Sequence, residues 1–312
     1  MENPLRKEPM KPAQIPKQKS VLLREIKKSL WIYLVLIPPF ILLMTFTLIP
    51  IGKSFLLSFQ EWSLHSIRWT GLENFVRLVK DPVFFKALQN TFIYTIVVVP
   101  VGTSIALVLA ELVRPQPPAV QTFFKSAFYL PAVVAAVVIV LVWRWIYNPA
   151  NYGLLNYLLS LVNRDPVLWL QDSKLALAAL TATSLVGGQG GAVVFILAAM
   201  GGIPVHLYES ARLDGSTRIK EFWFITLPLI TPTLLYLSVM GTIGSFQVFT
   251  GTYLLTMGGP NYATTTSVFY IYKTGFQNFE FGYASAQAVI LFLIIMGFSA
   301  FLFRTLAEDY EY

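Results

Sequence analysis

The chain has 312 residues, of which 55% are hydrophobic and only 12% are charged, and its mean hydropathy is +0.62. Soluble domains carry about 25% charged residues, so this composition excludes an ordinary soluble fold. Cysteine is absent, which excludes disulfides, thiol catalysis and thiolate metal sites. Several apolar runs approach the ~20 residues that a helix needs to cross a bilayer, and the alternating segments of a strand-built barrel do not occur. The sequence therefore predicts an all-α, polytopic membrane protein.

A basic tail accounts for much of the net charge of +7, because eight of the 23 lysines and arginines precede Leu30. Such a tail before a first span keeps the N-terminus in the cytoplasm, and we prefer this interpretation to nucleic-acid binding. No cleavable signal peptide is predicted, because the first apolar run is too long and lacks a small-residue end. We expect a cytoplasmic tail at 1–29, a six-span transmembrane domain at 30–304 and a cytoplasmic tail at 305–312.

Six apolar segments predict six transmembrane helices, at 30–51, 91–113, 123–146, 175–200, 229–251 and 284–303. With the N-terminus inside, the loops 114–122 and 201–228 are cytoplasmic, and 52–90, 147–174 and 252–283 lie outside. Asp81 and Pro82 predict a helix start that continues into the second span. The glycine-rich run 187–191 predicts bending or close helix contact within the fourth span.

The sequence contains none of the usual catalytic or nucleotide-binding motifs. It has no G-x-x-x-x-G-K-[ST] phosphate loop and no G-x-S-x-G elbow, and its two histidines, His65 and His206, fall on opposite predicted sides. We therefore expect no catalytic residue, no metal site and no cofactor, and a transport subunit rather than an enzyme. Ion-coupled carriers usually keep a buried ionisable side chain, but only Glu111, Lys125 and Arg144 are charged within the apolar spans, all of them near span ends.

The polar loop between the fourth and fifth spans is unusual in so apolar a chain. A proline at its start predicts a helix over 204–213. Asp214 and Gly215 should end this helix, since glycine permits a positive φ. Asp214 or Ser216 is expected to cap a second helix that runs through 222–225. The loop is thus predicted to form a helix–turn–helix along the cytoplasmic face, either as a docking surface or as an interfacial linker.

Residues 209–228 resemble the signature cytoplasmic loop of permeases of ATP-binding-cassette (ABC) importers, with the pattern E-A-A-x-x-D-G-A-x-x-x-x-x-F-x-x-I-x-L-P. The matching positions are Glu209, Ala211, Asp214, Gly215, Phe222, Ile225, Leu227 and Pro228, while Ser210 and Ser216 replace alanines. The resemblance implies the six-span, MetI-like permease fold and a coupling loop at 202–228. It also implies that a separate ATPase dimer docks on this loop, with Glu209 as the acidic contact. Asp214 and Gly215 would form the turn, and Pro228 would be the entry to the fifth span. Ala211 and Phe222 complete the set of residues that the resemblance assigns to ATPase coupling.

Outer motifs at 143–156 and 256–260 are similar to those of carbohydrate-type permeases of the maltose and glycerol-phosphate class. This similarity implies a second, homologous permease as partner, an extracytoplasmic solute-binding protein and a carbohydrate cargo. It also implies a multi-pass, lipid-embedded protein of a bacterial or archaeal plasma membrane, with no nucleic-acid partner. The sequence does not identify the sugar.

Residues 241–249 of the fifth span match the family's pathway helix, and the resemblance makes Ser245, Gln247 and Phe249 the first candidates to line the substrate pathway. Gln189 and Ser184 on the fourth span follow. Interhelical hydrogen bonding explains such polar residues equally well. Uncharged candidates favour a neutral oligosaccharide, and Arg144 leaves an acidic sugar open. The alternatives are an ABC permease for another solute, such as glycerol phosphate, and an ion-coupled secondary carrier.

Overall fold

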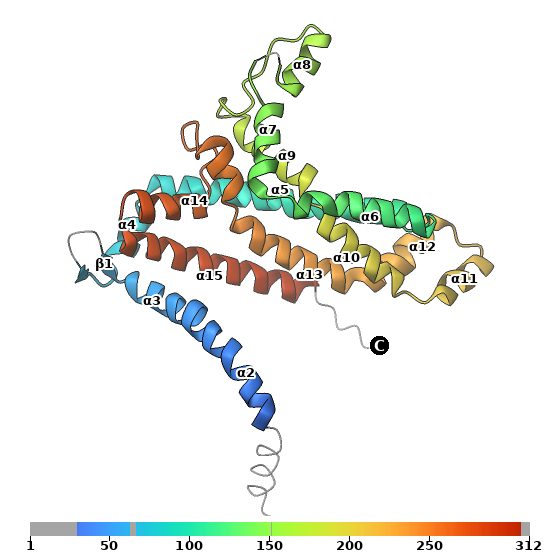
Figure 1. The fold of residues 1–312 in the computed structure, drawn as a ribbon, viewed down its shortest axis with the longest axis horizontal. Coiled ribbons are helices and arrows are strands. Elements are labelled where there is room, and N and C mark those ends of the chain that lie inside the picture. The colour runs from blue at the N-terminus through green and yellow to red at the C-terminus, as the bar shows by residue number, and fades with distance from the viewer. Residues whose placement is uncertain (1–29, 63–66, 151, 307–312) are drawn as a thin grey trace, which may run out of the picture. The chain divides into compact units, whose positions relative to one another are not determined.

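The computed structural model describes residues 30–62, 67–150 and 152–306, which are mostly helical (Figure 1). In chain order the elements are α2 (Leu30–Leu43), η1 (Met44–Leu48), α3 (Ile49–Leu57), β1 (Gln60–Trp62), β2 (Ile67–Trp69), α4 (Glu73–Val79), α5 (Pro82–Val113), α6 (Pro118–Val133), α7 (Ala136–Ile146), α8 (Leu154–Leu161), α9 (Ala176–Gly187), α10 (Gly190–Gly201), α11 (Val205–Leu213), α12 (Arg218–Glu221), η2 (Phe222–Thr226), α13 (Leu227–Phe246), η3 (Thr252–Thr256), α14 (Ser267–Tyr272), η4 (Lys273–Gln277) and α15 (Phe281–Leu306). The η elements are single π-helical turns. The tail predicted at 1–29 lies outside the described residues, and so do residues 307–312 of the tail predicted at 305–312. The first two residues of that tail, 305 and 306, belong to α15.

The chain divides into two units, one ending at Ser54 and one beginning at Phe55. In the first, α2, η1 and the start of α3 follow one another as a helix. Segment Leu34–Leu57 is apolar enough for a membrane span, with a mean hydropathy of 2.4. Within the first unit, apolar side chains such as Phe40 and Phe46 are exposed, as expected of a helix whose surroundings are lipid or another subunit.

Four helices are long and apolar enough to cross a membrane, and six segments are if each of two bent pairs counts as one span. The pair α6 and α7 bends by 94°, just after Pro131, which removes a helix hydrogen bond. The pair α9 and α10 bends by 43° at the glycine-rich run, as predicted. The predicted third span is therefore not a straight helix, whereas the number of six agrees with the bent-pair count.

The 32-residue helix α5 is the centre of the second unit, and α9, α10, α13 and α14 all pack on it. Its start is the predicted one: Asp81 accepts hydrogen bonds from the backbone N–H groups of Val83 and Phe84. Near its end, Ala106 and Ala110 are fully buried, because small side chains let helices approach closely. They belong to a cluster completed by Val113, Val193, Ile196, Leu197, Met200, Ile203, Tyr208 and Ile230.

A short hairpin, which sequence patterns did not predict, precedes α4. Strands β1 and β2 pair antiparallel, with Gln60 opposite Trp69 and Trp62 opposite Ile67. Gly282 at the start of α15 lies directly against the backbone of Gln60, where a Cβ atom would clash with its carbonyl oxygen. The hairpin thus packs on the first turn of α15, and a glycine permits the close approach.

Candidate functional site

The first half of the polar loop 201–228, which the sequence predicts to be cytoplasmic, folds as expected. Helix α11 follows Pro204, and Gly215 ends it with a φ of +77°. The cap of the next helix is different: neither Asp214 nor Ser216 supplies it, and the Thr217 hydroxyl accepts from the N–H of Lys220 at 3.5 Å. Since Gly215 already turns the chain, the extended residue that precedes the new helix is Thr217, and the cap belongs to that residue.

The predicted second helix of the loop is not a separate element. Elements α12, η2 and α13 form one helical segment, Arg218–Phe246, of 29 residues. The fifth span therefore begins about ten positions before the predicted start at 229, and it ends at Phe246 rather than at 251. Pro228 lies within this helix instead of at its entry. The π-turn before it, closed by the Leu227 N–H on the Phe222 carbonyl, is a usual way for a helix to adjust to proline.

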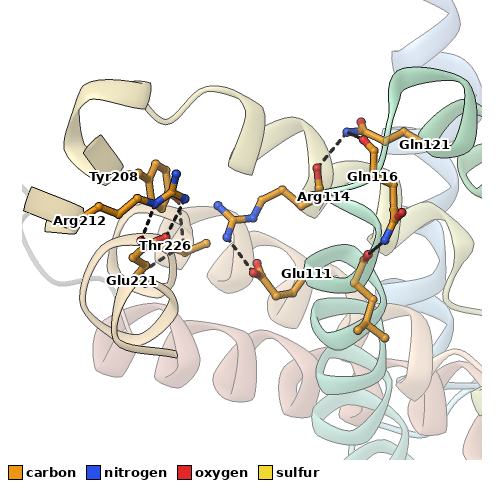
Figure 2. A network of polar contacts seen from close by, with 9 residues as sticks. Glu111, Arg114, Gln116, Gln121, Tyr208, Arg212, Glu221 and Thr226 are labelled. Carbon is orange, nitrogen blue, oxygen red and sulfur yellow. Dashed lines mark hydrogen bonds and ion pairs between the residues drawn. The ribbon is translucent and has the colours of Figure 1, made fainter. Parts of the chain in front are cut away.

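Two side-chain contacts tie α11 back onto the start of this long helix (Figure 2). Arg212 donates from Nε and Nη2 to the two carboxylate oxygens of Glu221, at 2.8 and 3.2 Å. The hydroxyls of Tyr208 and Thr226 lie 2.9 Å apart. The side chain of Glu221 is only 2% exposed and that of Arg212 is 61% exposed, so the guanidinium covers a buried carboxylate.

The end of α5 contributes the third contact of this site. Arg114 is paired with Glu111 at 2.7 Å, and its guanidinium carbon lies 5.0 Å from the centre of the Tyr208 ring (Figure 2). A hollow of about 220 Å³ lies among these side chains, lined by Glu111, Arg114, Tyr208, Arg212, Arg218 and Glu221. Helix α11 is therefore connected to the ends of two long helices by polar side chains.

The structure brings the predicted coupling residues into one segment, but in different surroundings. Glu209, Asp214 and Gly215 are exposed, and Ala211 is half-buried. Phe222 and Pro228 are half-buried, and Phe222 lines an apolar hollow with Leu112 and Trp223. The exposed end of α11 also presents Leu213, which is 90% exposed. A short helix with a free carboxylate and an apolar tip can insert into a groove of another protein.

The predicted pathway residues fall into two groups. Ser184 lies 2.6 Å from the hydroxyl of Tyr94, and the Gln189 amide lies over Gly102 and 3.4 Å from the Ser184 carbonyl. Both residues stand where α9 and α10 meet α5. Their side chains thus hold three helices together, and a contact of either with substrate stays a prediction.

The second group lies at the end of α13. Ser245 is buried, and Gln247 lines a largely apolar hollow of about 690 Å³ with Val268 and Phe292. Phe249 stacks on Tyr253 with ring centres 5.3 Å apart. Within the described ranges no hydrogen bond joins this group to Ser184 or Gln189. A contact of Ser245, Gln247 or Phe249 with substrate also stays a prediction.

A further hollow, of about 470 Å³, lies at the end of α7 and was not predicted as a site. It is lined by Arg144, Tyr147, Asn148, Trp169, Gln171 and Thr256. Asn156 organises its walls, donating to the carbonyls of Asn148 and Val167 and accepting from the Trp169 indole. Aromatic rings with a few amides and a guanidinium are a usual lining of a small-molecule site, and the 143–156 motif already contained three of these residues, Arg144, Tyr147 and Asn148.

Comparisons with known proteins agree with this architecture. Residues 99–309 match the family model "Binding-protein-dependent transport system inner membrane component". A probable ABC transporter permease, YurN of Bacillus subtilis, is 36% identical over 86% of this chain and 92% of its own length. The arabinooligosaccharide transport permease AraP of Halalkalibacterium halodurans is 29% identical, over 84% of this chain and 83% of its own length.

The fold also has a close counterpart among solved structures. A chain from a bacterial ABC transporter that imports the acidic polysaccharide alginate has a TM-score of 0.83, covering 93% of this chain and 99% of its own, at 24% identity. At that identity the likeness concerns the fold alone. The family model matches more than half of the chain, and YurN is 36% identical to it. These two findings exclude the alternative of an ion-coupled secondary carrier. This protein belongs to the inner-membrane permease family of binding-protein-dependent ABC transporters.

Proposed function

We propose that this protein forms half of the translocation pathway of a carbohydrate ABC importer. The observation that carries the proposal is α11, a short exposed helix that bears Glu209 and is tied by side chains to the ends of two long helices. A helix held in this way is suited to receive movement from a soluble ATPase subunit. A homologous permease would supply the second half of the pathway, and a solute-binding protein would deliver the cargo from outside.

Docking of the ATPase is tested by reversing the charge of one exposed residue. Glu209→Lys should abolish capture of the ATPase subunit by the tagged permease, whereas the variant still inserts in the membrane. Glu73→Lys on α4, an equally exposed carboxylate on the predicted outer side, is the matched control and should capture normally. Normal capture by Glu209→Lys would remove Glu209 from the docking surface.

The cargo class is supported by the name of the relative AraP and by the sugar-binding character of the hollow at Arg144. Glycerol phosphate remains the second candidate, because Arg144 is suited to bind an anionic group. Calorimetry of the partner solute-binding protein against neutral oligosaccharides, acidic oligosaccharides and glycerol 3-phosphate distinguishes these cargoes. Binding of amino acids alone would overturn the carbohydrate assignment.

The proposed orientation has both termini and α11 in the cytoplasm. Because the chain has no cysteine, single cysteines can be introduced without removing any native ones. Leu213→Cys in α11 should react with a membrane-impermeant maleimide only in inverted vesicles. Gln171→Cys, in the hollow that Arg144 lines, should react only in intact cells. The opposite pattern would reverse the topology.

A further inference from the structure

Arg212 and Glu221 occupy positions that the signature pattern leaves open, yet they form the one ion pair within residues 201–228, all of which the structure describes. The guanidinium binds both carboxylate oxygens, which fixes the orientation of the two groups as well as their distance. Glu221 is almost fully buried, and its carboxylate would lose its only ion-pair partner among the described residues if Arg212 were removed. Leaving a buried charge unpaired is strongly unfavourable, so this contact strongly favours one arrangement of α11.

The turn between α11 and α12 would not hold α11 in place by itself. It consists of residues 214–217 and includes Gly215 at positive φ, a conformation that glycine adopts easily. A single contact between two helices lets one pivot about that contact. Two contacts at separate points fix the direction of one helix axis relative to the other. Tyr208 and Arg212 are four residues apart and thus on one face of α11, so together they provide the two points.

The π-turn η2 positions the two side chains that Arg212 and Tyr208 contact, Glu221 and Thr226. Glu221 and Thr226 are five residues apart, a spacing that in a regular α-helix puts side chains on different faces. In η2 the hydrogen bonds run from residue i+5 to residue i, and the Thr226 hydroxyl lies 3.4 Å from the Glu221 carbonyl oxygen. The wider turn therefore brings Thr226 to the side where Tyr208 and Arg212 approach.

We infer that Arg212 and Glu221 are positioning residues of energy coupling, which with Tyr208, Thr226 and the π-turn η2 make α11 one rigid body with the fifth span. Movement imposed on α11 then reaches α13 directly and is not absorbed by the glycine turn. Arg114, stacked on Tyr208, extends the same body to the end of α5. This inference deepens the proposed function, because the force on α11 comes from the docked ATPase.

The test measures a distance between two spin labels in the full chain, purified as a complex with its ATPase subunit and the second permease. One label replaces Val205 at the start of α11 and the other replaces Tyr236 on α13, both exposed positions. In the parent the distance distribution should be narrow and the same without nucleotide and after trapping with ATP and vanadate. Arg212→Glu should broaden the distance distribution and make it differ between the nucleotide-free and the vanadate-trapped states. In the same variant, the stimulation of ATP hydrolysis by the solute-binding protein should be roughly tenfold smaller than in the parent.

Three further variants separate pairing from general damage. The double variant Arg212→Glu with Glu221→Arg should recover a narrow distribution. Arg212→Lys, which keeps the charge but cannot bind both oxygens in a fork, should lie between parent and Arg212→Glu. Lys220→Glu makes the same change of charge at an exposed neighbour and should leave the distribution narrow.

A narrow distribution in Arg212→Glu, or equal broadening in Lys220→Glu, would overturn the inference. So would a double variant that folds and stays as broad as the single one. Failure of the proposed function is recognised separately, because the ATPase would then not copurify with the parent. The nucleotide-free distances still report on the Arg212–Glu221 pair in that case.

Discussion

The hydroxyl of Tyr94 on α5 and the hydroxyl of Ser184 on α9 lie 2.6 Å apart, although 90 positions separate them in the chain. Ser184 was predicted to line the substrate pathway, with interhelical hydrogen bonding as the equal alternative. The observed bond supports the alternative for this side chain. Tyr94 also belongs to a buried cluster with Val140, Leu180 and Leu255, so the bond ties two helices at a packed position.

Removal of this bond should therefore cost stability. Ser184→Ala and Tyr94→Phe are each expected to lower the free energy of unfolding by about 0.6 kcal/mol, the average for such bonds between membrane helices. The free energy of unfolding of the double variant should be little lower than that of either single variant, because both changes remove the same interaction. Thermal unfolding in detergent measures all three. Fully additive losses would show that the two hydroxyls act independently.

The glycine-rich run offers a matched pair of substitutions. A Cβ atom on Gly190 would lie 1.8 Å from the carbonyl oxygen of Phe128 on α6, whereas one on Gly191 would meet nothing within 4 Å. Gly190→Ala should thus destabilise the fold by about 1–3 kcal/mol, because α6 and α10 must separate. Gly191→Ala should be neutral or stabilising by up to about 1 kcal/mol.

The melting temperatures of Gly190→Ala and Gly191→Ala test whether α6 and α10 are in close contact at Gly190. Equal melting temperatures would mean that α6 does not approach α10 closely at Gly190. The pair also separates the two roles predicted for the run, since bending would involve both glycines and close contact only one.

The cap of α12 gives a second matched pair. Thr217→Ala should cost about 1 kcal/mol, since the Thr217 hydroxyl accepts from the Lys220 N–H. Ser216→Ala removes the same group one residue earlier and should change stability by less than about 0.5 kcal/mol. Hydrogen exchange of the first amides of α12 provides the local measurement. A larger effect of Ser216→Ala would restore the cap that the sequence suggested.

Asp81 is expected to make stability depend on pH. Burial by itself would raise the pKa of Asp81, but hydrogen bonds from Tyr283 and Tyr270 at 2.6 and 2.7 Å and from two backbone N–H groups outweigh it. The pKa of Asp81 therefore lies below its ordinary value of 3.8. A lowered pKa stabilises the fold above pH 3.8, and this contribution is lost as pH falls through the lower value.

Asp81→Asn tests this dependence, because it keeps the shape of the side chain and removes its charge. The variant should be less stable than the parent by about 1.5–3 kcal/mol near neutral pH, the range for hydrogen bonds to a charged group. The difference should shrink as pH falls below 3.8, measured by unfolding of both proteins along a pH series. A difference that stays constant throughout would mean that the Asp81 charge is not what stabilises this end of α5.

Features set by neighbouring residues were predictable. Asp81 with Pro82 starts α5, Gly215 ends α11, and the glycine-rich run bends the fourth span, since each depends on backbone preferences that a residue carries with it. The family, too, followed from a short pattern in a fixed frame. The Thr217 cap was missed because Thr217 lies within three positions of the two predicted candidates, Asp214 and Ser216, and only the φ and ψ angles of the finished turn distinguish the three residues.

The sequence by itself thus determined the class of protein, the number of its apolar segments and the position of the polar loop between the fourth and fifth, because hydrophobicity and turn preferences are local. Only the tertiary structure decided that Arg212 covers Glu221 and that Tyr94 bonds to Ser184. Those contacts depend on the π-turn η2 and on how closely α5, α9 and α10 pack. The relative direction of two helices and the distance between them depend on the packed core as a whole, so no single segment of the sequence predicts them.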